Sequence, residues 1–70
     1  MSAPDAFDRA RPLIMEGTAA LARGDFLAAS NLFAVARHEL ILDCYPGEGL
    51  IRELANQSDK AMAELRAGPH

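Results

Sequence analysis

Apolar residues recur along this chain at intervals of three and four, and two short breaks divide the pattern into three segments. The breaks are Arg23–Asp25 and Tyr45–Gly49, where glycine or proline interrupts helical spacing. No stretch alternates apolar and polar residues with a period of two, so no strand is expected. The pattern therefore predicts one all-α domain over residues 1–70, with helices at about 5–23, 25–44 and 48–67.

Local signals mark the ends of these helices. Ser2 and Asp5 are spaced like a capping box, Asp25 is a good N-cap, and Gly68 followed by proline is a typical stop. Pro12 removes one backbone hydrogen bond from the first segment and clashes with the preceding turn. We therefore expect a kink at Pro12 or a helix that begins near it.

The 25–44 segment is apolar on most sides, which predicts a central helix enclosed by the other two. One of its stripes consists of Phe26, Ala29, Phe33, Ala36, Leu40 and Cys44. A second stripe consists of Leu27, Ala34, Ile41 and Tyr45, with Val35 and Leu42 beside it. The hinge at Gly24-Asp25 is too short for anything but an antiparallel hairpin, so the expected fold is a three-helix up-down-up antiparallel bundle.

The apolar surface of the 25–44 segment exceeds what a single hairpin hides. Either the third helix covers all of it, or part of it stays open as a groove or a self-association face. Met15 also falls off the apolar face of the first helix, and methionine adapts well at binding surfaces. The residues expected to bind a partner are Leu27, Val35, Leu42, Tyr45 and Met15.

Small and aromatic residues follow a fixed spacing across the first hairpin: Gly17, Ala20, Leu21, Gly24, Phe26, Ala29, Phe33 and Ala36. This pattern resembles the tetratricopeptide (TPR) helical hairpin, in which small residues let the second helix approach closely. Leu13 and Glu16 depart from the large aromatic and apolar residues that the repeat prefers, and Ile41 stands where it usually ends in proline. No second copy follows, and repeat proteins need about three stacked units, so a full TPR array is excluded.

The whole length is similar to the microtubule-interacting and transport (MIT) domain, a three-helix bundle whose first two helices resemble a TPR hairpin. Ile51-Arg52 and residues 61–65 are loosely similar to the last helix of that domain. This resemblance implies docking of short helical or extended tails in grooves beside the third helix. Small TPR-like secretion chaperones also look similar, and the residues do not decide between these families.

Charge and composition narrow the class of partner. The formal net charge is −3 and the seven basic residues are scattered, which argues against nucleic acid or an anionic membrane as the main partner. The longest apolar run, residues 32–36, is far too short to span a bilayer, and no signal peptide is recognisable, so a cytoplasmic location is expected. A chain of 70 residues with one cysteine has no internal disulfide, which favours association, such as a homodimer, as a source of stability.

Catalytic and metal-binding chemistry is weakly represented. His38 and Cys44 lie six residues apart on one helix, at different azimuths, so they cannot meet within it. Glu39 and Asp43 could share a cation, but no facing carboxylate pair completes a two-metal site. No enzyme activity, cofactor or metal is therefore expected. The predicted function is a protein–protein interaction module, an adaptor or chaperone that binds a helix or tail; the alternative is a homo-oligomeric structural bundle with no separate ligand.

Overall fold

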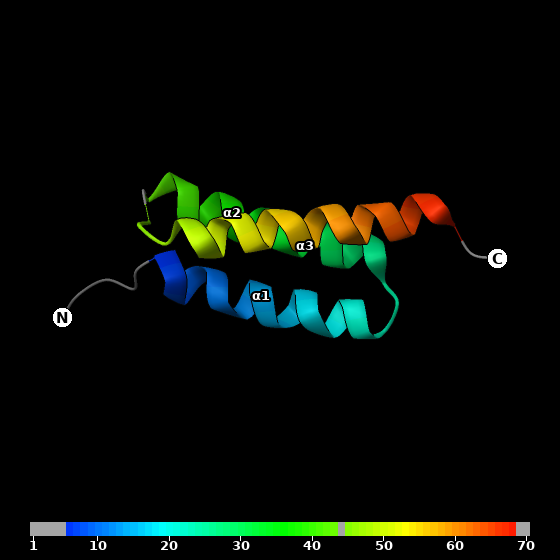
Figure 1. Cartoon of the computed structure of the whole chain (residues 1–70). Helices are drawn as coiled ribbons and strands as arrows, with labels where there is room; N and C mark the ends of the chain where they lie inside the picture. Colours follow the sequence, from blue (N-terminus) through cyan, green and yellow to red (C-terminus); the bar gives the residue numbers. More distant parts are fainter. Residues whose placement is uncertain (1–5, 44, 69–70) are drawn as a thin grey trace.

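A computed structural model of the chain describes residues 6–43 and 45–68. Three helices make up the fold: α1 (Ala6–Ala22), α2 (Phe26–Leu42) and α3 (Glu48–Ala67). Figure 1 shows α1 and α3 running in one direction and α2 in the opposite direction. The all-α, up-down-up antiparallel bundle is confirmed.

The helices of the bundle do not contact one another equally. Helix α2 packs extensively against both α1 and α3, whereas α1 and α3 make little contact with each other. The central position predicted for the 25–44 segment is therefore confirmed, but its enclosure is incomplete, because Leu27, Val35, Ile41 and Leu42 are exposed.

The helix boundaries follow the local signals closely. Asp25 caps α2 by accepting a hydrogen bond from the Ala28 amide at 3.3 Å. Helix α3 has the predicted bounds, and it ends at Gly68, whose φ of 77° suits glycine and whose amide bonds to the carbonyls of Glu64 and Leu65. Helix α2 ends at Leu42, two residues earlier than predicted. The capping box at Ser2 and Asp5 lies outside the described residues.

Pro12 does not begin the first helix. Helix α1 begins at Ala6 and runs through Pro12 to Ala22, so the expectation of a start near the proline is wrong. The amide that proline lacks would have bonded to a carbonyl in the first turn. Pro12 is exposed, and helical geometry continues on both sides of it.

The core is built mainly from small residues around a few large ones. Its buried apolar members are Ala10, Ala20, Ala29, Phe33, Ala36, Leu40, Leu54 and Ala61. Five of these eight are alanines, which bring the helix backbones close together but bury little area each. The fold therefore depends on close helix approach rather than on a voluminous core.

The α1–α2 contact centres on Gly17 and Phe33. Gly17 is buried, and a Cβ atom added there would lie 3.0 Å from the ring of Phe33. The absence of a side chain at Gly17 therefore makes room for that ring. This confirms that Gly17 faces the second helix, as the spacing of the hairpin predicts.

Two hydroxyl groups join α2 to α3. The Ser58 hydroxyl donates to the Ser30 carbonyl at 3.2 Å, and the two serine hydroxyl oxygens lie 3.3 Å apart. Ser30 is buried, so these bonds satisfy a polar group that has lost its access to water. The pair fixes the position of α3 along α2.

Candidate functional site

A groove lies between α1 and α3, with α2 as its floor. The hollow has a volume of about 320 Å³ and is lined by Ile14, Thr18, Leu21, Phe33, Leu50, Glu53, Leu54 and Gln57. Five of these eight residues are apolar. The groove exists because α1 and α3 both pack on α2 without closing on each other.

Regular spacing on each wall produces the apolar lining. Ile14, Thr18 and Leu21 are one helical turn apart on α1, and Leu50, Leu54 and Gln57 are one turn apart on α3. Phe33 and Leu54 at the bottom are almost fully buried, whereas Ile14, Leu21 and Leu50 are half-buried. The half-buried side chains leave apolar surface that an incoming side chain can cover.

Polar groups in the groove are sparse and ordered. The Gln57 side-chain amide donates to the Glu53 carboxylate at 2.9 Å, which holds that carboxylate beside α3. The Thr18 hydroxyl donates to the Ile14 carbonyl at 2.9 Å, so its hydrogen is used within α1. Glu53 is the charged member of the lining and is exposed to solvent.

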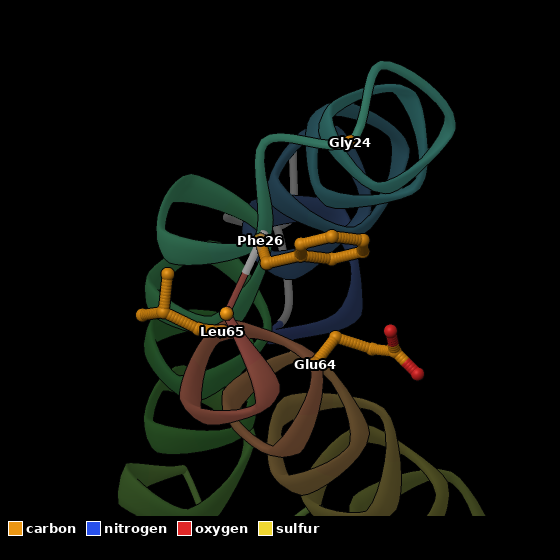
Figure 2. Close-up of a pocket in the computed structure, with 5 residues that line it drawn as sticks. Gly24, Phe26, Glu64 and Leu65 are labelled. Carbon is orange, nitrogen blue, oxygen red and sulfur yellow. The ribbon is translucent and has the colours of Figure 1, made fainter. Parts of the chain in front are cut away.

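A second hollow lies at the far end of α3. It also has a volume of about 320 Å³ and is lined by Gly24, Phe26, Glu64, Leu65 and Gly68. Figure 2 shows the Phe26 ring between the turn at Gly24 and the end of α3, with Glu64 and Leu65 projecting to opposite sides. Its charged lining residue, Glu64, is again acidic.

The side of α2 that faces away from the groove carries exposed apolar residues. Leu27, Val35, Ile41 and Leu42 are 53%, 47%, 43% and 62% exposed. Three of the five residues expected to bind a partner therefore lie together on this one helix: Leu27, Val35 and Leu42. Helix α3 therefore leaves these apolar side chains of α2 exposed.

The other two expected binding residues lie elsewhere. Met15 is 63% exposed but belongs to α1, about 140° around that helix from the buried Ala10. Tyr45 follows α2 and is half-buried against the core, and its ring stacks on Phe7 with centroids 6.3 Å apart. The structure does not bring Met15 or Tyr45 together with the outward residues of α2.

Glu39 and Asp43 do share a cation, which is the guanidinium of Arg9. Arg9 bonds to Glu39 at 3.2 Å and also to Asp43, and so ties α1 to the end of α2. Hydrogen bonds to Asp43 and then to Glu39 raise the pKa of Arg9 above its usual value. Through Arg9, the two carboxylates link α1 to the end of α2.

The other candidates for chemistry are dispersed. His38 is exposed on α2, and Cys44 and His70 lie outside the described residues. Among residues 6–43 and 45–68, no three His, Cys, Asp or Glu side chains gather closely enough to hold a metal ion. Within the same ranges, no helix combines the length and the apolar character needed to cross a membrane.

The spacing of residues did not locate the groove between α1 and α3; the MIT resemblance alone implied grooves beside the third helix. Ile14, Leu21, Leu50 and Leu54 belong to apolar helix faces, and spacing does not tell whether such a face is fully covered. The signal that could have found the groove is the small size of Gly17, Ala20 and Ala61, which indicates a core too thin to fill three helix faces. Comparison of the chain with models of known families, with curated proteins and with solved structures found no significant match.

Proposed function

We propose that this chain is a protein–protein interaction module that binds an amphipathic helix of another protein in the groove between α1 and α3. The observation that carries the proposal is the groove itself, an apolar trough between two parallel helices. A helix laid into such a trough buries apolar residues at intervals of three and four, and this is a common mode of peptide recognition.

The groove and the second hollow lie one after the other along α3, and together they suit a ligand of several helical turns. Along α3, the two hollows are lined in turn by Leu50, Leu54 and Gln57 and then by Leu65 and Gly68. From residue 50 to residue 68 a helix rises about 27 Å. A ligand helix of about 18 residues matches that length, with its leucine or isoleucine side chains directed at Phe33 and Leu54.

Charge supports a partner with basic residues beside its apolar seam. The charged residues that line the two hollows are Glu53 and Glu64, and both are acidic. Lysine or arginine side chains at the edge of the ligand helix would lie opposite them. Such rim contacts contribute mainly to orientation and association rate, and salt screens them.

A pair of designed peptides tests this directly. Both are 18-residue amphipathic helices with the same leucine seam, flanked in one by lysines and in the other by glutamates. We expect the lysine peptide to bind in the micromolar range, by fluorescence anisotropy of a labelled peptide. Its affinity should fall by roughly threefold or more when the salt concentration rises from about 0.05 M to about 0.5 M.

Variants on one helix locate the site. Thr18 lines the groove, whereas its neighbour Ala19 does not, and both are exposed. Thr18→Arg should reduce binding of the lysine peptide at least about tenfold by filling the trough and adding like charge. Ala19→Arg adds the same charge to the same helix and should leave the affinity almost unchanged.

Chemical-shift mapping decides the outcome independently of affinity. The lysine peptide should shift the amide signals of Ile14, Leu21, Leu50 and Gln57. If it shifts mainly the signals of Leu27, Val35 and Leu42, or if the Thr18 and Ala19 variants bind equally well, the groove is not the binding site and the proposal fails.

The family resemblance is compatible with this function but does not establish it. An MIT-like arrangement implies ligands in grooves beside the third helix, and the α1–α3 groove is one such position. Several expectations stay predictions: the TPR-like and MIT-like resemblances, the adaptor or chaperone role, the absence of catalysis and the cytoplasmic location.

A further inference from the structure

The outward side of α2 is a continuous strip of seven exposed residues: Leu27, Asn31, Ala34, Val35, His38, Ile41 and Leu42. We name it the α2 outer strip. It holds four of the seven large apolar side chains that are exposed in the described part of the chain. The buried residues of α2 lie on the opposite side, and α3 borders the strip at Ala34, which lines a hollow of about 210 Å³ with Arg37, Ala55, Ser58 and Asp59.

The α2 outer strip contains no Asp, Glu, Lys or Arg, although 24% of the chain is charged. The chain has a net charge of −3, so two copies repel each other unless they meet at uncharged surfaces. Of the charged residues of α2, Arg37 and Glu39 lie beside the strip, and Glu39 is held by Arg9. The strip itself therefore presents no like charges to a second copy, and the charged residues that border it at Ala34, which are Arg37 and Asp59, are of opposite sign.

The spacing of the strip is that of a helix–helix seam. Residues 27, 31, 34, 38 and 41 are separated alternately by four and three positions. Alternation of four and three produces the 3.5-residue period at which two helices pack side chains into each other along their length. Ala34, at the midpoint of α2, is small enough to let two backbones approach closely.

The strip is also complementary to itself when reversed. If two α2 helices pair antiparallel about a two-fold axis between residues 34 and 35, the layer of Leu27 meets that of Leu42 of the second copy. The layer of Asn31 meets that of His38, and Ala34 and Val35 meet their own copies. Apolar layers thus meet apolar layers, and the two polar layers meet each other, as a two-fold interface requires.

A parallel pairing lacks this match in the polar layers. It would place His38 opposite His38 and align the two helix dipoles in the same direction. In the antiparallel pairing the amide of Asn31 offers both a donor and an acceptor to the imidazole of His38, twice per dimer. A buried polar pair of this kind selects one register over its alternatives.

We infer that a second copy of this chain docks antiparallel on the α2 outer strip, forming a symmetric dimer whose register is set by Asn31 of each copy and His38 of the other. Helix α2 has 17 residues and is about 25 Å long, so the contact is smaller than a standard interface. The dimer should therefore dissociate in the micromolar range. Both α1–α3 grooves lie on the sides away from the seam and stay open.

Solution mass over a hundredfold range of concentration measures the dimer. The unaltered chain should change from monomer to dimer as its concentration rises. Val35→Glu should keep it monomeric at every concentration while far-ultraviolet circular dichroism shows unchanged helicity, because Val35 is half exposed. Met15→Glu adds the same charge at a site on α1 with 63% exposure and should leave dimerisation intact.

Disulfide mapping tests the orientation, in a Cys44→Ser background. Val35→Cys should form a cross-linked dimer by itself, because residue 35 meets its own copy at the axis. Leu27→Cys and Leu42→Cys should cross-link when mixed but not separately. Met15→Cys measures the rate of chance collisions between exposed thiols.

Three outcomes overturn the inference. The first is a monomer at all concentrations, which would leave the strip to another protein. The second is a cross-linking rate for Val35→Cys equal to that of Met15→Cys. The third is self-cross-linking of Leu27→Cys and of Leu42→Cys, which indicates a parallel pair. None of these results bears on the peptide-binding groove, because that test follows the amide signals of residues on α1 and α3.

Discussion

The two interfaces that α2 makes within the bundle are built in different ways. Against α1, the ring of Phe33 fills the space left by Gly17, and the Arg9 guanidinium binds two carboxylates of α2. Against α3, small residues and the hydroxyl pair of Ser30 and Ser58 carry the contact. The first interface depends on shape, and the second depends on hydrogen bonds made by serine hydroxyls between closely packed helices. We therefore expect the bulk of a side chain to matter most at the first interface.

Gly17→Leu should have the largest effect. The added side chain has no space beside Phe33, so either α2 moves away from α1 or the ring leaves its rotamer, and overpacking of this kind costs about 1–3 kcal/mol. Chemical denaturation monitored by circular dichroism measures the loss. Since a core of this size supplies only about 3–5 kcal/mol, this loss is a large part of the total stability.

A second glycine provides the control. A Cβ atom added at Gly49, in the first turn of α3, meets nothing within 4 Å. Gly49→Ala should therefore be neutral or stabilise the chain by up to about 1 kcal/mol, because it restricts the unfolded state. Equal destabilisation by Gly17→Leu and Gly49→Ala would contradict the shape-based contact between α1 and α2.

Ser58→Ala should have an intermediate effect, about 0.5–1.5 kcal/mol, because it leaves the buried hydroxyl of Ser30 without its partner on α3. The double change Ser30→Ala with Ser58→Ala removes both groups and should be more stable than Ser58→Ala alone. Denaturation of the two single variants and the double variant gives the coupling. If the two losses simply add, the hydroxyl pair does not join α2 to α3.

Arg9→Gln should have the smallest effect. The guanidinium and both carboxylates are partly exposed, so water and salt screen their attraction. We expect a small decrease in Tm at low ionic strength and almost none in concentrated salt, measured by thermal denaturation. A large decrease that persists in high salt would mean that Arg9 contributes through the packing of its side chain rather than through its charge.

Local chemistry was enough to predict the helix ends to within two residues. Asp25 caps α2 because its carboxylate reaches an amide three residues ahead, and Gly68 ends α3 because glycine adopts positive φ without strain. Gly17 was placed correctly because the period of a helix determines which residues share a face. Of the two expectations for Pro12, a helix start near it is wrong, because helical turns both precede and follow the proline; the kink stays a prediction.

The candidate sites were predicted less completely. The second apolar stripe of α2 identified Leu27, Val35 and Leu42 as a shared surface, but spacing alone did not decide whether α3 covers them. The same limitation applies to Glu39 and Asp43, whose partner Arg9 is 30 and 34 residues away in the chain. Contacts of that kind depend on how whole helices are placed, which no local pattern records.

The sequence by itself therefore determined the elements of this protein: three helices, their hairpin order and the residues on each face, because these follow from backbone geometry within a few turns. Tertiary structure decided what those faces do. Helices α1 and α3 both pack on α2 through small residues and stay apart from each other, since alanine and glycine bring helices close to α2 without filling the third side. That arrangement opens the groove on one side of α2 and leaves the α2 outer strip exposed on the other.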